Sequence, residues 1–246
     1  MQTKNGTPDK KAYKRILLKL SGEALMGNEK FGIDPEFIFY LAEEIKKVHD
    51  AGVEMVIVVG GGNIFRGVAG SDKGIERVTA DYMGMLATIF NGLALKDALI
   101  RKDVAVRLQT AFEMKAIAEP YIREKAIRHL QKGRVVITSG GTGLPYVTTD
   151  TASAIRGLEL KCQAIFKATG VDGVYEDDPK IDPNAKKYDT LSIDEAFKND
   201  KIRIMDKSAL ELCRSNKVNI VVFNLYKKGN LEKAIYGENS GTVIKA

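Results

Sequence analysis

Cysteine and histidine are scarce in this 246-residue chain, which contains two of each. Cys162 and Cys213 cannot build a disulfide framework, and this fits a reducing environment such as the cytosol. No Cys/His cluster has metal-ligand spacing, and His49 and His129 both fall on charged helical faces. We therefore expect no structural zinc site, no metal-ligating side chains and no histidine-based catalyst.

A signal peptide and a long basic run are also missing. Residues 1–14 are polar and contain lysine, so we expect a flexible N-terminal extension and a cytoplasmic protein. The 38 basic residues are mixed with 32 acidic ones along almost every segment, and the net charge is +6. A dispersed excess of this kind is weak support for nucleic-acid binding, and we expect phosphate-binding residues in a cleft instead.

Short apolar runs alternate with longer amphipathic ones. Strands are expected at 15–21, 53–59, 104–109, 134–139, 164–169 and 219–224, with 242–246 as a last edge strand. The first helix is expected between the N-cap and N1 pair Asp34-Pro35 and the terminator Gly52. Further helices are expected near 79–100, 119–132, 149–161 and 206–216. This pattern predicts a three-layer α/β/α sandwich with a mainly parallel central sheet, in one domain over 15–246.

The stretch Tyr82–Leu95, YMGMLATIFNGLAL, carries no charge. It is too short for a membrane span, which needs about 20 apolar residues. A helix that is apolar on all faces must be buried on all faces, either within one domain or in a subunit interface. Because α/β layers usually leave one helix face to solvent, we predict a homo-oligomer and no membrane contact.

Two common phosphate-binding motifs are incomplete. The run GEALMGNE (22–29) has the glycine spacing of a P-loop, but Asn28 and Glu29 replace the lysine and hydroxyl residues. The run GGGNIF (60–65) has Phe65 in place of the third glycine of a dinucleotide fingerprint. The chain is thus neither a Walker NTPase nor a standard Rossmann dehydrogenase.

Three glycine-rich turns remain, KLSG (19–22), GGGN (60–63) and GGTG (140–143), and each follows an expected strand. In a parallel sheet the carboxyl ends of the strands share one edge, where exposed backbone N–H groups suit anionic oxygens. One such motif is most often only a tight turn. Three of them, accompanied by Lys19, Arg66 and Lys167, favour phosphate binding.

Several charged residues are candidates for the chemistry. Lys19 and Lys167 interrupt apolar strands, where charge is costly, so we expect a bound phosphate or a nearby carboxylate as partner. Asp150, at the start of an expected helix, either caps that helix or holds the two lysines. Arg66 is placed to fork onto a phosphate. Asp81 either caps the uncharged helix or accepts hydrogen bonds from a sugar or base.

Five segments together resemble the bacterial UMP kinases (uridylate kinases) of the amino-acid-kinase superfamily: KRILLKLSGEAL, VVGGGNIFRG, TADYMGMLAT, GTGLPYVTTDTASAIRG and KATGVDGVYEDDP. The resemblance runs nearly colinearly from about residue 13 to the C-terminus. It implies an amino-acid-kinase-like domain that assembles as a hexamer and, with Mg²⁺, transfers the γ-phosphoryl group of ATP to UMP in pyrimidine nucleotide biosynthesis. It also implies an acceptor-binding part (15–165) and an ATP-binding part (166–246).

The resemblance further implies roles for single residues. The ATP-binding positions are Lys19, Leu20, Ser21, Gly22, Gly62, Arg66, Thr169, Tyr175 and Asp178. The UMP-binding positions are Gly61, Asp81, Thr142, Gly143, Leu144, Pro145, Tyr146, Val147, Thr148 and Thr149. The segment Gly27, Asn28, Glu29, Lys30, Phe31 and Gly32 corresponds to the region of activation by GTP, and inhibition by UTP is a family trait. Leu144 stands where the family commonly has asparagine, so amide contacts are lost there while backbone contacts survive.

The mechanism implied by the resemblance needs no general base, because UMP is already an anionic phosphate monoester. Catalysis then depends on aligning two polyanions and neutralising the transferred group. Lys19 and Lys167 are expected to neutralise that group, Asp150 to orient the lysines, and Arg66 to bind phosphate.

Two alternatives remain. One is a related phosphotransferase that acts on a carboxylate or carbamate, and the other is a non-catalytic nucleotide-sensing or nucleic-acid-binding regulator. Arg66, Asp81 and the VTTDTA loop (147–152) favour a nucleotide acceptor over the first. The presence of both lysines together with Asp150 and Asp178 argues against the second.

Overall fold

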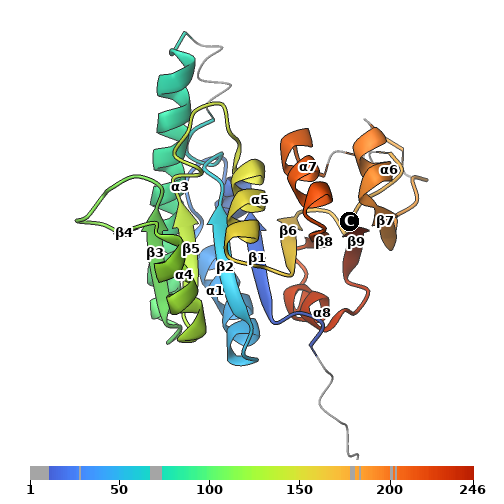
Figure 1. Ribbon diagram of the computed structural model, residues 1–246, viewed down its shortest axis with the longest axis horizontal. Helices are drawn as coiled ribbons and strands as arrows, with labels where there is room; N and C mark the ends of the chain where they lie inside the picture. The colour runs from blue at the N-terminus through green and yellow to red at the C-terminus, as the bar shows by residue number, and fades with distance from the viewer. Residues whose placement is uncertain are drawn as a thin grey trace, which may run out of the picture.

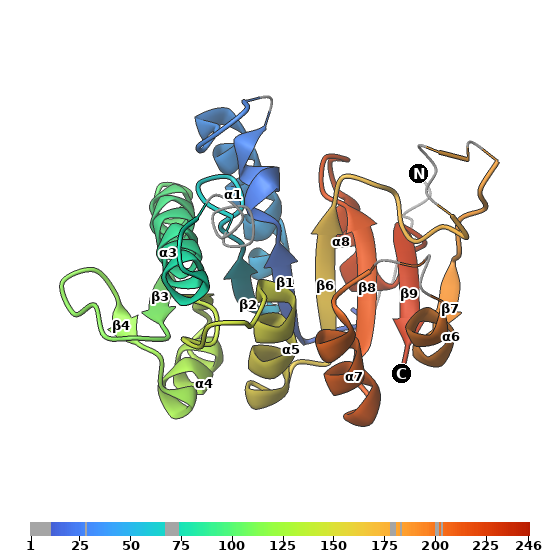
Figure 2. The same cartoon turned by 90° about the horizontal axis from the view of Figure 1, so that it is seen from above.

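The computed structural model describes residues 11–27, 29–66, 74–177, 181–182, 184–199, 202 and 204–246. Within these ranges one mixed sheet is covered by helices on both faces, which confirms the predicted three-layer α/β/α sandwich (Figures 1 and 2). Most of the expected N-terminal extension, residues 1–10, lies outside the described residues.

The strands of the sheet are β1 (Arg15–Leu20), β2 (Glu54–Val59), β3 (Val106–Thr110), β4 (Glu119–Pro120), β5 (Val135–Ser139), β6 (Ala164–Thr169), β7 (Thr190–Ser192), β8 (Asn219–Asn224) and β9 (Gly241–Lys245). Their order is β4-β3-β5-β2-β1-β6-β8-β9-β7. Among the described strands only the β8–β9 pair is antiparallel, so the sheet is mainly parallel, as predicted.

The helices are a 3₁₀ helix η1 (Gly22–Met26) and the α-helices α1 (Pro35–Asp50), α3 (Arg77–Ile100), α4 (Arg123–Gln131), α5 (Thr149–Glu159), α6 (Ile193–Lys198), α7 (Lys207–Ser215) and α8 (Asn230–Tyr236). The start of α1 is as predicted, since the Asp34 side chain accepts hydrogen bonds from the N–H groups of Glu36 (2.9 Å) and Phe37 (3.3 Å). The chain leaves α1 through Gly52, whose φ of 76° is left-handed.

Two apolar cores lie on opposite faces of the sheet, because successive strand residues point to opposite sides. In β1, Ile16 and Leu18 belong to the core beneath α1, α3 and α8, whereas Leu17 belongs to the core beneath α4, α5, α6 and α7. Figure 2 shows these two helical layers on either side of the sheet. Lys19 lies two residues after Leu17 in β1, so its side chain points toward the same face of the sheet, which α5 covers.

The structure corrects the positions of two predicted elements and contains others that were not predicted. The run 242–246 is not an edge strand, because β9 lies between β8 and the short strand β7. The helix expected from 119 begins at Arg123, since Glu119–Pro120 pairs with β3 and a residue before proline disfavours the helical region. The helices α6 and α8 were not predicted because two turns or fewer show no clear periodicity.

The uncharged stretch lies in α3, and only one side of it is buried within the described chain. Ala87, Ile89 and Leu95 are buried, whereas Leu86 and Phe90 are exposed by 49% and 57%. By length and composition α3 also satisfies the criteria for a membrane span, but half of that window is buried. A core helix of a globular domain meets the same criteria, and α3 packs on β3 and β5.

Candidate active site

Two lysines and one aspartate meet where β1 and β6 run side by side. Lys19 and Lys167 are direct neighbours in the parallel register of these strands. Asp150, in the first turn of α5, lies between them, with Lys19 Nζ 2.7 Å from Oδ1 and Lys167 Nζ 2.9 Å from Oδ2. Lys167 Nζ also donates to the carbonyl of Ile204. The structure thus supplies the carboxylate partner that the sequence required for both lysines.

The charges in this cluster depend on one another. Burial opposes ionisation of Asp150, but the two neighbouring ammonium groups outweigh it and lower the pKa of the carboxyl. Burial also lowers the pKa of Lys167, and this is partly offset by Asp150. The two ammonium groups share the carboxylate of Asp150, and Asp206 acts on Lys167 more weakly. An anionic oxygen that enters beside these two ammonium groups is favoured by their positive charge.

Asp150 does not cap α5, which settles the alternative left open by the sequence. The cap is Thr148, whose Oγ1 accepts hydrogen bonds from the N–H groups of Asp150 (3.2 Å) and Thr151 (3.3 Å). The hydroxyls of Thr148 and Thr151 in turn donate to Asp206, which caps α7 by accepting from Ala209 N at 2.8 Å. Asp206 thereby fixes the starts of α5 and α7 to each other, a role that its position before a helix did not reveal.

Two of the three glycines in the triplet, Gly60 and Gly61, are required by backbone packing, and so is Gly22 beside them. A Cβ on Gly22 would lie 2.6 Å from Gly62 N, and one on Gly60 would lie 2.8 Å from Gly22 N. A Cβ on Gly61 would lie 2.7 Å from the Gly84 carbonyl oxygen in α3. Gly62 differs, since its Cβ would meet nothing closer than Arg66 Nε at 3.7 Å. The protein alone therefore does not require glycine at 62, and a ligand can approach the backbone there.

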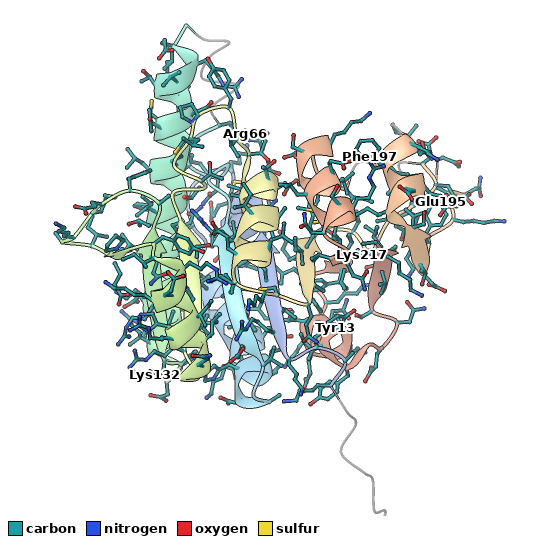
Figure 3. All side chains as sticks on the ribbon, in the orientation of Figure 1. Tyr13, Arg66, Lys132, Glu195, Phe197 and Lys217 are labelled. Carbon is teal, nitrogen blue, oxygen red and sulfur yellow. The ribbon has the colours of Figure 1, made fainter. Side chains whose placement is uncertain are left out.

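Arg66 lies beside this glycine. Its Nε donates to the Gly62 carbonyl at 3.4 Å, and its Nη2 pairs with the Glu23 carboxylate on η1. Both side chains of this ion pair are more than half exposed, so the pair contributes little to stability. Figure 3 shows Arg66 at the end of the sheet where β1 and β2 finish. Among the described residues, the Glu23 carboxylate and the Gly62 carbonyl compete with a phosphate at this edge for the guanidinium.

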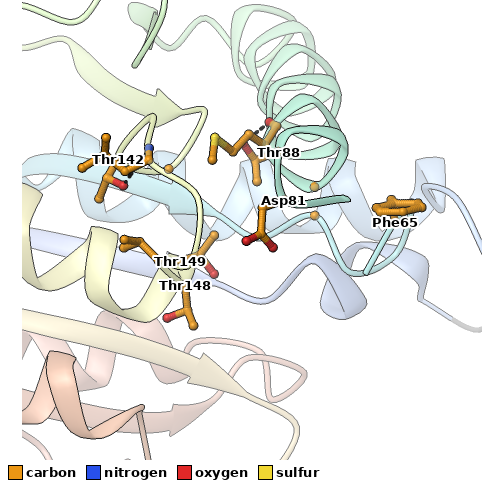
Figure 4. Close-up of a pocket in the computed structure, with 12 residues that line it drawn as sticks. Phe65, Asp81, Thr88, Thr142, Thr148 and Thr149 are labelled. Carbon is orange, nitrogen blue, oxygen red and sulfur yellow. Dashed lines mark hydrogen bonds between the residues drawn. The ribbon is translucent and has the colours of Figure 1, made fainter. Parts of the chain in front are cut away.

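A pocket lies next to the lysine cluster, between the first half of α3 and the loop that precedes α5 (Figure 4). Its cavity volume is about 160 Å³, and it is partly open to solvent. Its lining includes seven of the residues predicted for UMP: Gly61, Asp81, Thr142, Leu144, Val147, Thr148 and Thr149. Gly143, Pro145 and Tyr146 belong to the same loop without lining the pocket.

Five further lining residues were not predicted, namely Phe65, Gly84, Met85, Thr88 and Gly141. Thr88 also fixes the loop, because its Oγ1 accepts the N–H of Gly140 at 2.7 Å. Small and polar residues at 84 and 88, one turn apart in an uncharged helix, are the signal from which this side of α3 was predictable.

Asp81 is not the cap of α3, which begins at Arg77 and is capped by the carboxylate of Glu76. It lies one turn further on and accepts hydrogen bonds from Arg77 Nε (2.9 Å) and from the N–H of Tyr146 (2.8 Å). Asp81 lines the pocket, and its predicted hydrogen bonds to a sugar or base stay a prediction.

The remaining predicted residues lie around this edge. Leu20 is buried at the end of β1, and Ser21 precedes η1 without capping it through its side chain. Thr169 ends β6, and its Oγ1 donates to the Val171 carbonyl at 2.9 Å. Tyr175 forms an isolated antiparallel β-bridge with Lys187. Thr169 and Tyr175 do not line the pocket, and Asp178 lies outside the described residues.

Gly32, at the end of the segment 27–32, is hydrogen-bonded to Asn63, which directly follows the glycine triplet. Gly32 N donates to the Asn63 carbonyl at 3.1 Å, and Asn63 Nδ2 donates to the Gly32 carbonyl at 2.8 Å. Phe31 is 67% exposed, Gly27 has a left-handed φ of 56°, and Glu29 and Lys30 follow on the surface. Asn28 lies outside the described residues.

The described part of the chain contains no group of three or more His, Cys, Asp or Glu side chains arranged to hold a metal ion. The carboxylate nearest to the lysine cluster, Asp150, is already paired on both oxygens.

Comparison with known proteins places this geometry in a family. A model of the amino acid kinase family matches residues 14–224. The crystal structure of UMP kinase from Bacillus anthracis is 42% identical, with a TM-score of 0.91, over 95% of this chain and 96% of that one. UMP kinase from Ureaplasma parvum is 37% identical, with a TM-score of 0.89, over 95% and 99%. Uridylate kinase from Archaeoglobus fulgidus is 29% identical, with a TM-score of 0.73, over 93% and 99%. The chain belongs to the amino acid kinase family.

Proposed function

We propose that this protein is a phosphotransferase that transfers the γ-phosphoryl group of ATP to UMP and forms UDP, a step of pyrimidine nucleotide biosynthesis. The observation that carries this proposal is the continuity of pocket and lysine cluster. Thr148 and Thr149 line the pocket, and the next residue, Asp150, holds Lys19 and Lys167. A molecule in the pocket can thus present its phosphate directly to the lysines. The likeness to solved UMP kinases supports UMP as that molecule.

In this proposal the two parts of the domain hold one substrate each. Residues 15–165 bind UMP through the lining residues and the adjoining loop residues Gly143, Pro145 and Tyr146, and residues 166–246 bind the ATP nucleoside through Thr169, Tyr175 and Asp178. The ATP phosphates lie along the segment 19–22 and Gly62. The lysines come from both parts, because β1 carries Lys19 and β6 carries Lys167.

The chemistry follows from the charges. The attacking oxygen belongs to a phosphate and is already anionic, so no side chain has to remove a proton. Lys19 and Lys167 neutralise the phosphoryl group during its transfer, and Asp150 fixes both ammonium groups in place. Arg66 exchanges Glu23 for a phosphate and keeps donor and acceptor together. Mg²⁺ bound to the ATP phosphates, a common arrangement for this ion, would shield their charge.

An acceptor panel tests the proposed function. UMP, CMP, acetylglutamate and carbamate are each offered with ATP and Mg²⁺, and ADP formation is measured with and without GTP. We expect UMP to have by far the highest kcat/KM. A preference for acetylglutamate or carbamate instead identifies a related phosphotransferase that acts on a carboxylate or carbamate. The absence of turnover with every acceptor identifies a non-catalytic regulator.

We also propose control by nucleotides in the cytoplasm, with activation by GTP through the segment 27–32 and inhibition by UTP. The hydrogen bonds between Gly32 and Asn63 support this, since they connect the segment to the triplet beside the phosphate site. UTP has the base and sugar of UMP and is expected to compete with it.

A homo-oligomer, with a hexamer as the expected form, accounts for the exposed side of α3. Met83, Leu86 and Phe90 lie on one side of this helix and are exposed by 38%, 49% and 57%. We propose that a second copy of the chain covers this stripe.

Substituting Leu86→Glu together with Phe90→Glu is expected to reduce the mass of the assembly in light scattering, because two charges then enter the interface. Ile100→Glu is the matched control, since Ile100 is 53% exposed at the other end of the same helix. Circular dichroism verifies that the fold remains. An unchanged mass for the double variant places the interface elsewhere.

A further inference from the structure

Arg77 does not line the pocket, but it holds a residue that does. It is the first residue of α3, and its Nε donates to Oδ2 of Asp81, one turn further on, at 2.9 Å. The same oxygen accepts the N–H of Tyr146, from the loop before α5, at 2.8 Å. Two donors from different segments therefore converge on one carboxylate oxygen.

The other oxygen of Asp81, Oδ1, has no hydrogen-bond partner within the described residues, while the side chain lines the pocket (Figure 4). A carboxylate accepts hydrogen bonds on both oxygens. Because Oδ2 is engaged twice, the carboxylate cannot rotate freely, and Oδ1 is left available for a donor inside the pocket. The side chain is 15% exposed, so such a donor meets little competition from solvent.

Tyr146 holds the arrangement from the other side. The guanidinium of Arg77 lies over its ring, 5.1 Å from the ring centroid. Tyr146 has a left-handed φ of 64°, which is uncommon for a residue other than glycine and costs on the order of 1 kcal/mol or more. This conformation persists because its N–H is bound by Asp81 and its ring by Arg77. We refer to Arg77, Asp81 and Tyr146 as the Arg77 clasp.

The Arg77 guanidinium also offsets the negative charge of Asp81 at the pocket. An unpaired carboxylate beside two phosphate-bearing substrates would repel them. The guanidinium neutralises Asp81 through one oxygen and leaves the other free to accept from a neutral hydroxyl. The neutral donors of UMP are its sugar hydroxyls and the N3–H of uracil, and a comparison of UMP with dUMP distinguishes the two.

We propose that Arg77 is a positioning residue for the sugar of the acceptor, and that by fixing Oδ1 of Asp81 it makes the pocket prefer a ribonucleotide over the matching 2′-deoxyribonucleotide. This inference rests on the proposed function for the identity of the acceptor. It assigns Arg77 no contact with the substrate, and it adds a determinant of specificity outside the pocket lining.

The test measures binding of UMP and dUMP by calorimetry, which does not depend on turnover. The wild type is expected to bind UMP about tenfold or more tightly than dUMP, as the loss of one hydrogen bond to a charged group predicts. In Arg77→Met this ratio is expected to fall close to one, as in Asp81→Asn. Arg77→Lys keeps the charge without the planar fork and is expected to recover part of the ratio.

Arg101→Met is the matched control, because Arg101 makes a similar i,i+4 ion pair with Asp97 (2.8 Å) beyond the other end of α3. It is expected to keep the wild-type ratio. A wild-type ratio in Arg77→Met, or a wild type that binds dUMP as well as UMP, overturns the inference. Equal weakening of both nucleotides, accompanied by a lower melting temperature, also overturns it, since that is a purely structural role. Failure of the proposed function is seen separately, as absence of turnover with UMP.

Discussion

Lys19→Ala is expected to lower kcat for the transfer from ATP to UMP by about 10²–10³-fold, the usual cost of removing one preorganised charge or donor from a transition state. The affinity for UMP is expected to change far less, because the pocket residues do not include Lys19. The fold is expected to persist, since the ion pair between Asp150 and Lys167 remains. Steady-state kinetics gives kcat, and calorimetry gives the dissociation constant of UMP.

Lys132→Ala is the control for this variant. Lys132 is exposed at the end of α4 and lies at the opposite end of the molecule from Arg66 (Figure 3). It is expected to leave both quantities unchanged. If Lys19→Ala weakens UMP binding as much as it slows turnover, Lys19 acts in binding the acceptor and not in stabilising the transferred group.

Asp150→Asn is expected to lower the free energy of unfolding by about 3–5 kcal/mol, which is typical of removing one partner from a buried ion pair. Asparagine has nearly the same shape, so no cavity forms. The loss comes from two ammonium groups on side chains that are at most 15% exposed, are direct neighbours across β1 and β6, and no longer share a carboxylate. Urea denaturation at fixed protein concentration and neutral pH measures the change.

A surface pair calibrates this measurement. Asp97→Asn removes the carboxylate of an exposed pair with Arg101 and is expected to cost less than about 1 kcal/mol. Adding Lys167→Met to Asp150→Asn removes one of the two repelling charges and is expected to recover part of the lost stability. An unfolding free energy for Asp150→Asn equal to that of the wild type means that the carboxylate does not stabilise the lysines.

The sequence was sufficient for the layers of the fold, because alternating strands and helices leave few other arrangements. It also indicated that Lys19 and Lys167 need an anionic partner. Their direct pairing was not predictable, since it depends on the register of two strands separated by more than 140 positions in the chain. The edge strand β7 was missed because three residues carry no usable alternation.

At the candidate site, the glycine triplet shows the limit of sequence reasoning. Three glycines indicated a bare backbone, but not that Gly60 and Gly61 are needed for contacts within the protein while Gly62 is not. In the uncharged helix, the spacing of Gly84 and Thr88 was the one sign of the side that faces the pocket, and Met85 and Thr88 were missed. The substrate roles of the individual residues stay predictions.

The helix α3 connects two surfaces of the protein. Asp81 and Thr88 lie on the side that lines the pocket, and Leu86 and Phe90 lie on the opposite side, which is exposed. A 24-residue helix is about 36 Å long and moves over a few turns as a rigid rod. A tilt of α3 imposed from its exposed side would therefore also move the wall of the pocket. A second copy of the chain bound to Leu86 and Phe90 would in this way influence the space available to the acceptor.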